Sequence, residues 1–164
     1  MKTRKLILVA PLFLLLITAL FSFKKSPTKT SYKCMIQMKN YSGEGAYVII
    51  SLLNAKGAYE ETLSVQGADD EWYFDLKEWW NFYGKKRANI DAITGATISG
   101  GQRTVRIINI PDAAVDTGYK IRFESAVEDQ KYHKDDVEFD LTSENVKSKF
   151  EGKGFIRYIR MIPK

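Results

Sequence analysis

A threonine with very small neighbours stands near the middle of the chain. Residues 91–99 read Asp-Ala-Ile-Thr-Gly-Ala-Thr-Ile-Ser, and two further glycines follow. Gly95 and Ala96 place almost no side-chain bulk beside Thr97, and Gly95 also allows backbone angles that are closed to other residues. We therefore expect the Thr97 hydroxyl to be uncrowded, so that a second macromolecule can reach it.

This run resembles the Asp-x-x-(Ser/Thr)-Gly-Ala-Thr-x-(Ser/Thr) signature at which flavin transferases attach FMN. The same signature occurs in the FMN-carrying subunits of Rnf-type complexes and sodium-pumping quinone reductases. All its fixed positions are filled here, by Asp91, Thr94, Gly95, Ala96, Thr97 and Ser99. The resemblance implies that Thr97 carries FMN as a phosphodiester and that the other five residues belong to the cofactor-binding site. The alternative is a tight turn between two strands, for which Thr-Gly and Gly-Gly are ordinary sequences.

Several charged residues lie close to this motif in the sequence. A phosphodiester keeps one negative charge, which a nearby cation could meet. Arg103 is the better candidate because it follows the glycines directly, whereas Lys85 and Lys86 are more typical of a solvated loop. Asp91 would serve recognition by the transferase or brace the turn as an Asx-type cap.

The sequence contains no set of residues that would suit metal binding, acid–base catalysis or nucleophilic catalysis. His133 is the only histidine, and no second histidine or cysteine near it completes a transition-metal site, so we expect a polar residue at a strand edge. Adjacent carboxylates such as Asp135 and Asp136 would face opposite ways along a strand and make a poor acid–base pair. The sequence contains no nucleophile elbow, Walker loop or Rossmann glycine pattern. We expect no catalytic residue and no bound metal.

Residues 1–25 read as a signal peptide or an N-terminal membrane anchor. A basic start is followed by 18 uncharged, mostly apolar residues from Leu6 to Phe23. As a helix, this run would span about 27 Å, just enough to cross a bilayer core. No Ala-x-Ala cleavage site follows, which favours an uncleaved anchor over a removed signal. Either way, the rest of the chain is expected in the periplasm or at the outer face of the cytoplasmic membrane.

The basic character of the chain belongs to this export segment. The whole sequence has a formal charge of +5, but residues 1–25 hold five of the 25 Lys and Arg residues and none of the 20 acidic ones. The remainder is neutral, with 20 residues of each sign. A basic isoelectric point would otherwise suggest nucleic-acid binding. Because the rest of the chain is neutral, we do not expect it to bind nucleic acid. Residues 26–31 are expected to form a short tether.

Residues 32–164 predict one all-β domain. Apolar and β-branched runs of strand length alternate with turns that contain Gly, Pro and Asp. The expected strands cover residues 32–38, 46–53, 59–65, 103–110, 119–127, 137–141 and 155–162. Short strands joined by polar turns are typical of a sandwich or barrel.

One helical insert interrupts the strands. Residues 69–71 are acidic, which suits a helix N-terminus, and aromatic residues then recur at helical spacing until Gly84, the expected stop. We expect Leu76 and Trp80 in the core. For Trp79, packing in the core and stacking beside a flavin ring remain equally open.

Residues 46–133 resemble a family of predicted periplasmic bacterial proteins that carries only a domain-of-unknown-function label. The resemblance rests on the order of a strand pair around a Gly turn, Trp79-Trp80, the motif at 91–97, Gly118-Tyr119 and Tyr132-His133. It implies an immunoglobulin-like β-sandwich that is associated with PepSY-type membrane proteins and flavin transferases. Relatives tend to have a Trp-Asp sequence after the glycines, which this chain lacks, and this difference weakens any claim that residues 104–117 form part of a site.

Two functions from different classes follow. In the first, the protein is an exported redox carrier whose FMN on Thr97 passes electrons between a membrane redox partner and an extracytosolic acceptor. In the second, it is a flavin-free periplasmic β-sandwich that serves as a binding or scaffolding module.

Overall fold

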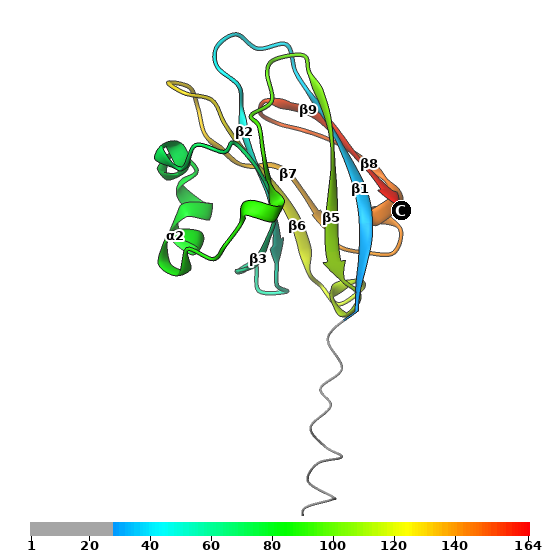
Figure 1. Cartoon of the computed structure of the whole chain (residues 1–164). Coiled ribbons are helices and arrows are strands. Elements are labelled where there is room, and N and C mark those ends of the chain that lie inside the picture. Colours follow the sequence, from blue (N-terminus) through cyan, green and yellow to red (C-terminus); the bar gives the residue numbers. More distant parts are fainter. Residues whose placement is uncertain (1–27) are drawn as a thin grey trace, which may run out of the picture.

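Two sheets packed face to face form the body of residues 28–164, the part that the computed structural model describes (Figure 1). One sheet has the strand order β5-β1-β9-β8 and the other β4-β3-β2-β6-β7, and every pairing except β3 with β4 is antiparallel. The strands are β1 (Lys29–Met38), β2 (Tyr47–Leu53), β3 (Tyr59–Gln66), β4 (Thr94–Gly95), β5 (Arg103–Pro111), β6 (Lys120–Ala126), β7 (His133–Asp140), β8 (Lys149–Glu151) and β9 (Ile156–Pro163). The predicted all-β sandwich with a helical insert is confirmed, while the predicted signal or anchor at 1–25 lies outside the described residues.

Some strand boundaries differ from the prediction. β1 begins at Lys29, because Lys29, Thr30 and Ser31 pair with β5, so half of the expected tether is strand. β7 begins at His133 rather than at residue 137, and the short β8 was not predicted. The polar start of β7 hides a buried residue: Asp136 accepts hydrogen bonds from Ser125 Oγ at 2.5 Å and from the Gly154 and Ile156 amides at 2.6 and 2.9 Å.

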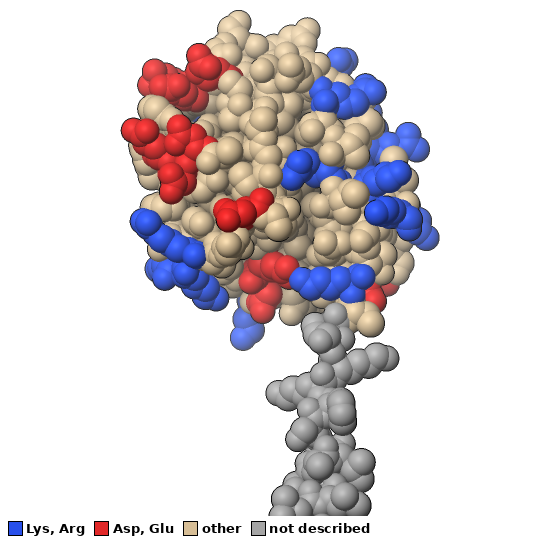
Figure 2. All heavy atoms as spheres, viewed as in Figure 1, with Lys and Arg blue, Asp and Glu red and all other residues tan. Residues whose placement is uncertain are grey.

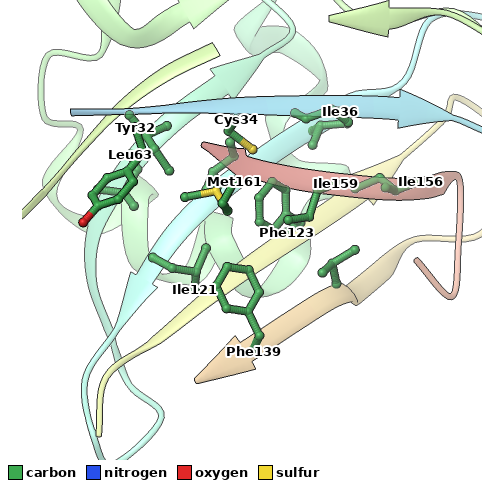
Figure 3. Close-up of a cluster of buried hydrophobic side chains, with 14 of the residues drawn as sticks. Tyr32, Cys34, Ile36, Leu63, Ile121, Phe123, Phe139, Ile156, Ile159 and Met161 are labelled. Carbon is green, nitrogen blue, oxygen red and sulfur yellow. The ribbon is translucent and has the colours of Figure 1, made fainter. Parts of the chain in front are cut away.

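The space between the sheets is filled by alternating side chains (Figure 3). Cys34 and Ile36 of β1 and Met161 of β9 face Phe123 and the other apolar residues of β6 and β7, and all four are at most 1% exposed. Each large apolar side chain buried in this way stabilises the fold by about 1.5–3 kcal/mol. Burial also raises the pKa of the Cys34 thiol, which packs here as a small apolar side chain.

The helical insert covers the outer face of the five-stranded sheet. It consists of the 3-10 helix η1 (Asp70–Asp75) and the α-helix α2 (Lys77–Lys86), which meet at Leu76. The prediction that this helix stops at Gly84 is wrong. The helix continues to Lys86, and its C-cap is Arg87, whose backbone lies in the left-handed region (φ 42°). Gly84 instead lies against the indole of Trp80, where a Cβ would stand 3.2 Å from Trp80 Cε2. Three shorter 3-10 helices follow: η2 (Asp91–Ile93), η3 (Asp112–Ala114) and η4 (Asn145–Lys147).

A second apolar cluster lies between this insert and the sheet, and its central residue is Trp79. Trp79 is fully buried; its ring stacks on Tyr83 at 4.6 Å and meets Tyr73 edge-on at 5.1 Å, while its Nε1 donates to Thr62 Oγ1 at 2.9 Å. Leu76 is buried as predicted. The prediction for Trp80 is confirmed only in part: its ring packs against this cluster but is half-buried, because α2 turns its neighbour Trp79 toward the sheet. Trp79 therefore has no exposed surface on which a flavin could stack.

Candidate functional site

Thr97 is exposed in a loop whose backbone is held on both sides. Before it, Thr94 and Gly95 form β4, which pairs with β3 in parallel, and the Gly67 amide donates to the Gly95 carbonyl at 2.7 Å. After it, Ile98 forms an antiparallel bridge with Ala46 through two hydrogen bonds of 2.9 and 3.0 Å. The threonine thus projects from a short span between two fixed points, and not from a tight turn between two long strands.

Ile98 is the anchor of this loop. Its side chain is 3% exposed, and its carbonyl accepts a hydrogen bond from the Tyr41 hydroxyl at 2.5 Å, which itself accepts from the Ala46 amide at 2.8 Å. Ser99 is exposed, and its amide donates to Gln102 Oε1 at 3.2 Å. The alternation of exposed Thr97, buried Ile98 and exposed Ser99 therefore fixes which side chains of the motif face outward.

The other residues of the motif shape the loop. Thr94 Oγ1 donates to the Ile90 carbonyl at 2.9 Å. Asp91 begins η2 and is exposed, but the Asx-type cap predicted for it is made by Asn89, whose Oδ1 accepts from the Asp91 amide at 3.0 Å. The Asp91 carboxylate is exposed and accepts one long hydrogen bond, from Asn89 Nδ2 at 3.4 Å, and Ala96 is exposed beside Thr97.

Gly95 is needed because the side chains of Arg106 and Gln66 approach its Cα closely, and not because its backbone angles are unusual. Its φ is not positive, contrary to the reason that the sequence suggested. A Cβ at this position would stand 2.9 Å from Arg106 Nη1 and 3.2 Å from Gln66 Oε1. The Arg106 guanidinium also donates to the Ile93 carbonyl at 3.4 Å, so this arginine braces the loop from beneath.

Arg103 lies elsewhere, which corrects the prediction that it meets the motif. Residues of β5 alternate between the two faces of its sheet, and Arg103 belongs to the outward set while Arg106 belongs to the inward one. Arg103 donates to Gln37 Oε1 at 2.9 Å and to the Tyr158 hydroxyl at 3.3 Å. The cations at the C-terminal end of α2 lie against aromatic rings: Lys86 is 5.3 Å from the Phe82 ring centroid, and Arg87 is 5.5 Å from the Trp80 ring centroid.

A hollow of about 180 Å³ opens beside Thr97. Tyr47 of β2 and Trp72 of η1 supply aromatic surface, and a neighbouring hollow of about 310 Å³ shares Trp72 and the residues that follow β6. Small-molecule pockets usually have a volume of at least about 300 Å³. The first hollow alone is smaller than this, but the two neighbouring hollows together reach it. The lining residues of the first are Glu44, Gly45, Tyr47, Trp72, Asp75, Thr97, Ala126, Val127 and Glu128.

The hollow is acidic. Three carboxylates line it and no lysine or arginine does. Burial, with the charges of Asp69 and Glu128, raises the pKa of Tyr47. Figure 2 shows acidic side chains at upper left and basic ones at lower left, on the side of the helical insert, and further basic ones along the right side, over the four-stranded sheet. The carboxylates would repel a phosphate, so the hollow is better suited to an apolar aromatic ring of a ligand than to a phosphate.

The sequence did not reveal the aromatic walls of the hollow. Tyr47 lies 50 residues before Thr97, in a strand where it reads as an ordinary sheet residue, and Trp72 lies in a segment read as one continuous helix. The break at Leu76 turns η1 toward the loop that carries Thr97. No local pattern in the sequence predicts that break.

A separate buried polar cluster lies beneath α2. The Glu124 carboxylate is fully buried and accepts hydrogen bonds from the hydroxyls of Tyr59, at 2.6 Å, and Tyr132. Arg122 reaches the Tyr59 hydroxyl at 3.3 Å and pairs with Glu138 at 2.7 Å. Burial outweighs these hydrogen bonds and raises the pKa of Glu124 to about 7.

This shift predicts a pH-dependent stability. The ordinary pKa of 4.5 applies to the unfolded chain, so between that value and about 7 the folded protein binds the extra proton. The free energy of unfolding should therefore fall as the pH rises through this window, by on the order of 3 kcal/mol from Glu124 alone. In urea denaturation, Glu124→Gln should be more stable than the wild type at about pH 8, with the gap closing toward about pH 5. A gap that does not change with pH would show that Glu124 ionises normally.

The comparisons with known proteins give a family and no closer relative. Among residues 28–164, no helix is long and apolar enough to cross a membrane. No curated protein and no solved structure matches the chain. The family model described as a predicted periplasmic protein (DUF2271) matches residues 29–158, which include strands β1 to β8, the start of β9, the helical insert and the Thr97 loop. The chain therefore belongs to the DUF2271 family of predicted periplasmic proteins.

Proposed function

We propose that this protein is an exported redox carrier that holds FMN covalently on Thr97. The observation that carries the proposal is the position of Thr97. The residue that the flavin-attachment signature marks is exposed, is held between β4 and the Ala46–Ile98 bridge, and stands at a hollow with the aromatic walls Tyr47 and Trp72. An exposed acceptor on a fixed backbone beside apolar ring surface suits a tethered, flat aromatic group.

The residues present fit such a group in three ways. Thr97 Oγ1 would bond to the phosphorus of an FMN group that the transferase takes from an anhydride-linked flavin nucleotide; the anhydride bond would break, and the leaving phosphate and the threonine proton would depart with the transferase. Tyr47 and Trp72 would hold the ring system, and the carboxylates of Glu44 and Glu128 would keep the anionic phosphate out of the hollow. FMN, once bound, supplies the ability to accept and donate one or two electrons. The protein's own task is then to hold and present it.

A flavin transferase and a PepSY-type membrane redox protein are the partners in this proposal. The exposed Asp91 carboxylate would contact the transferase, because it stands on η2 ahead of the acceptor and has no strong partner beyond Asn89 at 3.4 Å. The membrane protein would exchange electrons with the carrier at the outer face of the cytoplasmic membrane. The family's periplasmic description supports this location.

Intact mass tests the proposal. The full chain is produced with and without a flavin transferase, and the expected product has gained one FMN less one water, is yellow and fluoresces in a denaturing gel. An unchanged mass beside an active transferase overturns the proposal. A flavin-free binding or scaffolding module would then remain.

Gly45→Ala provides a test of position rather than of chemistry. A Cβ at residue 45 would stand 2.7 Å from Thr97 Cβ and closer still to its Oγ1, so the threonine side chain must move. We expect the initial rate of flavin attachment to fall by between about 10-fold and 100-fold, the usual cost of misplacing a reacting group by about 1 Å.

A glycine far from the site is the control for this variant. Gly57 lies in the β2–β3 hairpin with φ 78°, and a Cβ there would contact nothing within 4 Å. Gly57→Ala should lower stability through its strained backbone while leaving the attachment rate unchanged. Equal attachment rates for Gly45→Ala and the wild type would contradict the role of the Gly45–Thr97 contact.

A further inference from the structure

The outer face of the four-stranded sheet carries three of the four exposed large hydrophobic side chains of residues 28–164. The exposed large hydrophobic residues among residues 28–164 are Phe74, Val105, Ile107 and Ile162, and the last three lie on this face. Val105 and Ile107 are 54% and 50% exposed on β5, and Ile162 is 41% exposed on β9. Strand pairing brings them together through β1, where Lys33 stands between Ile107 and Ile162.

Cations surround these apolar side chains. Arg103 lies in one cross-strand row with Gln37 and Tyr158, and its hydrogen bonds to both show that all three share the outer face. Arg160 and Lys149 pair across β9 and β8 in the next row, beside Val105. With Lys33, these residues place four cations on the outer face against one carboxylate, Glu151; a further outward cation of β1, Lys29, is paired with Glu61 at 2.7 Å.

A basic hollow adjoins this face. It is lined by Lys39, Lys149, Glu151, Gly152, Arg157 and Tyr158. Lys149 stands 4.4 Å from the Tyr158 ring centroid and 3.6 Å from the Glu151 carboxylate. Two further cations, Lys39 and Arg157, thus have access to an anionic group placed here.

We propose that the outer face of the sheet β5-β1-β9-β8 docks on the surface of a bilayer that contains anionic phospholipids. Aliphatic side chains among Lys and Arg, with a tyrosine beside them, are typical of surfaces that settle at the headgroup level. A second copy of the chain is disfavoured as the occupant, because two faces with the same excess of cations repel each other.

The chain itself favours a membrane over an acidic protein. Five residues separate Phe23, where the apolar run ends, from Lys29, the first residue of β1. The intervening chain can span only about 20 Å when fully extended. β1 lies inside this sheet, so an N-terminal segment held in the bilayer keeps the face within reach of the headgroups. The acidic hollow beside Thr97 lies on the other sheet.

Two labelled variants of the full chain test the docking. Val105→Cys and Phe74→Cys each replace a residue that is 54% exposed, one on the proposed face and one on η1 over the other sheet. Cys34 is fully buried, so a polarity-sensitive fluorophore labels only the new thiol. The proteins are reconstituted into vesicles of phosphatidylcholine alone or with about 30% phosphatidylglycerol.

We expect a blue shift at residue 105 in the anionic vesicles that reverses with added salt, and none at residue 74. Adding Arg103→Gln and Arg160→Gln should lower the ratio of docked to free domain roughly 30-fold, because each cation lost at an anionic surface weakens binding several-fold. An unchanged denaturation midpoint confirms that the variants are folded. Equal spectra at residue 105 in both vesicle types would overturn the proposal, whether or not Thr97 carries flavin.

Discussion

The Thr97→Ala protein will stay colourless when it is made beside a flavin transferase that turns the wild-type chain yellow. Removing the hydroxyl removes the oxygen that would be joined to the phosphate, so the expected loss of the added mass is complete. The fold should be unaffected, because the side chain is exposed, and the free energy of unfolding should change by less than about 0.5 kcal/mol. Intact mass and in-gel fluorescence measure the first effect, and urea denaturation measures the second.

Neighbouring hydroxyls are the matched controls. Thr97→Ser keeps an acceptor oxygen in place and should retain attachment. Ser99→Ala should also retain it, because Ser99 lies beyond the buried Ile98 and its backbone is held by Gln102. A Thr97→Ala protein that still gains the mass of FMN, with the label lost in Ser99→Ala, would move the attachment point by two residues and contradict our assignment.

Trp79→Ala should destabilise the protein more than any other single truncation of the helical insert. The indole is fully buried, stacks on Tyr83 and packs against Tyr73, and its Nε1 donates to Thr62. Truncating a buried tryptophan leaves a cavity and costs about 3–5 kcal/mol. The substitution also removes the hydrogen bond that the Thr62 hydroxyl accepts from Trp79 Nε1. Urea denaturation followed by circular dichroism measures the change in the free energy of unfolding.

Trp80→Ala is the comparison that makes this prediction specific. Trp80 has the same side chain one position later in α2, but it is only half-buried and contacts Arg87 and Gly84. We expect it to cost about 1 kcal/mol, in the ordinary range for single substitutions. Equal costs for the two variants would mean that the second apolar cluster contributes little to stability.

The sandwich could be read from the sequence because its core strands alternate cleanly. In β1, Cys34 and Ile36 are buried while their neighbours Lys33, Met35 and Gln37 are not, and the β-branched run of β2 is bounded by glycines. The start of β7 was missed because its buried residue is an aspartate, which is stabilised by amides of the 152–156 turn rather than by apolar contacts. A polar residue that is buried through distant hydrogen bonds leaves no periodic signal.

The site was predictable only as far as it is local. The motif at 91–99 could be found along the chain, but its surroundings depend on tertiary contacts. Arg103 is closer to Thr97 in sequence than Arg106, yet strand alternation turns Arg103 away and brings Arg106 under Gly95. The order of Trp79 and Trp80 was misjudged for a similar reason: the break at Leu76 sets which indole meets the sheet, and helical spacing alone does not.

The hollow beside Thr97 has a bearing on how the protein matures. Its walls come from the segments 44–47, 72–75 and 126–128, which the chain brings together only when the five-stranded sheet and the insert are complete. In a newly made, unfolded polypeptide Thr97 is present, but the hollow next to it does not yet exist. A chromophore on Thr97 would enter the hollow only when the domain folds, and its emission would then change. Its emission would therefore distinguish folded molecules from unfolded ones.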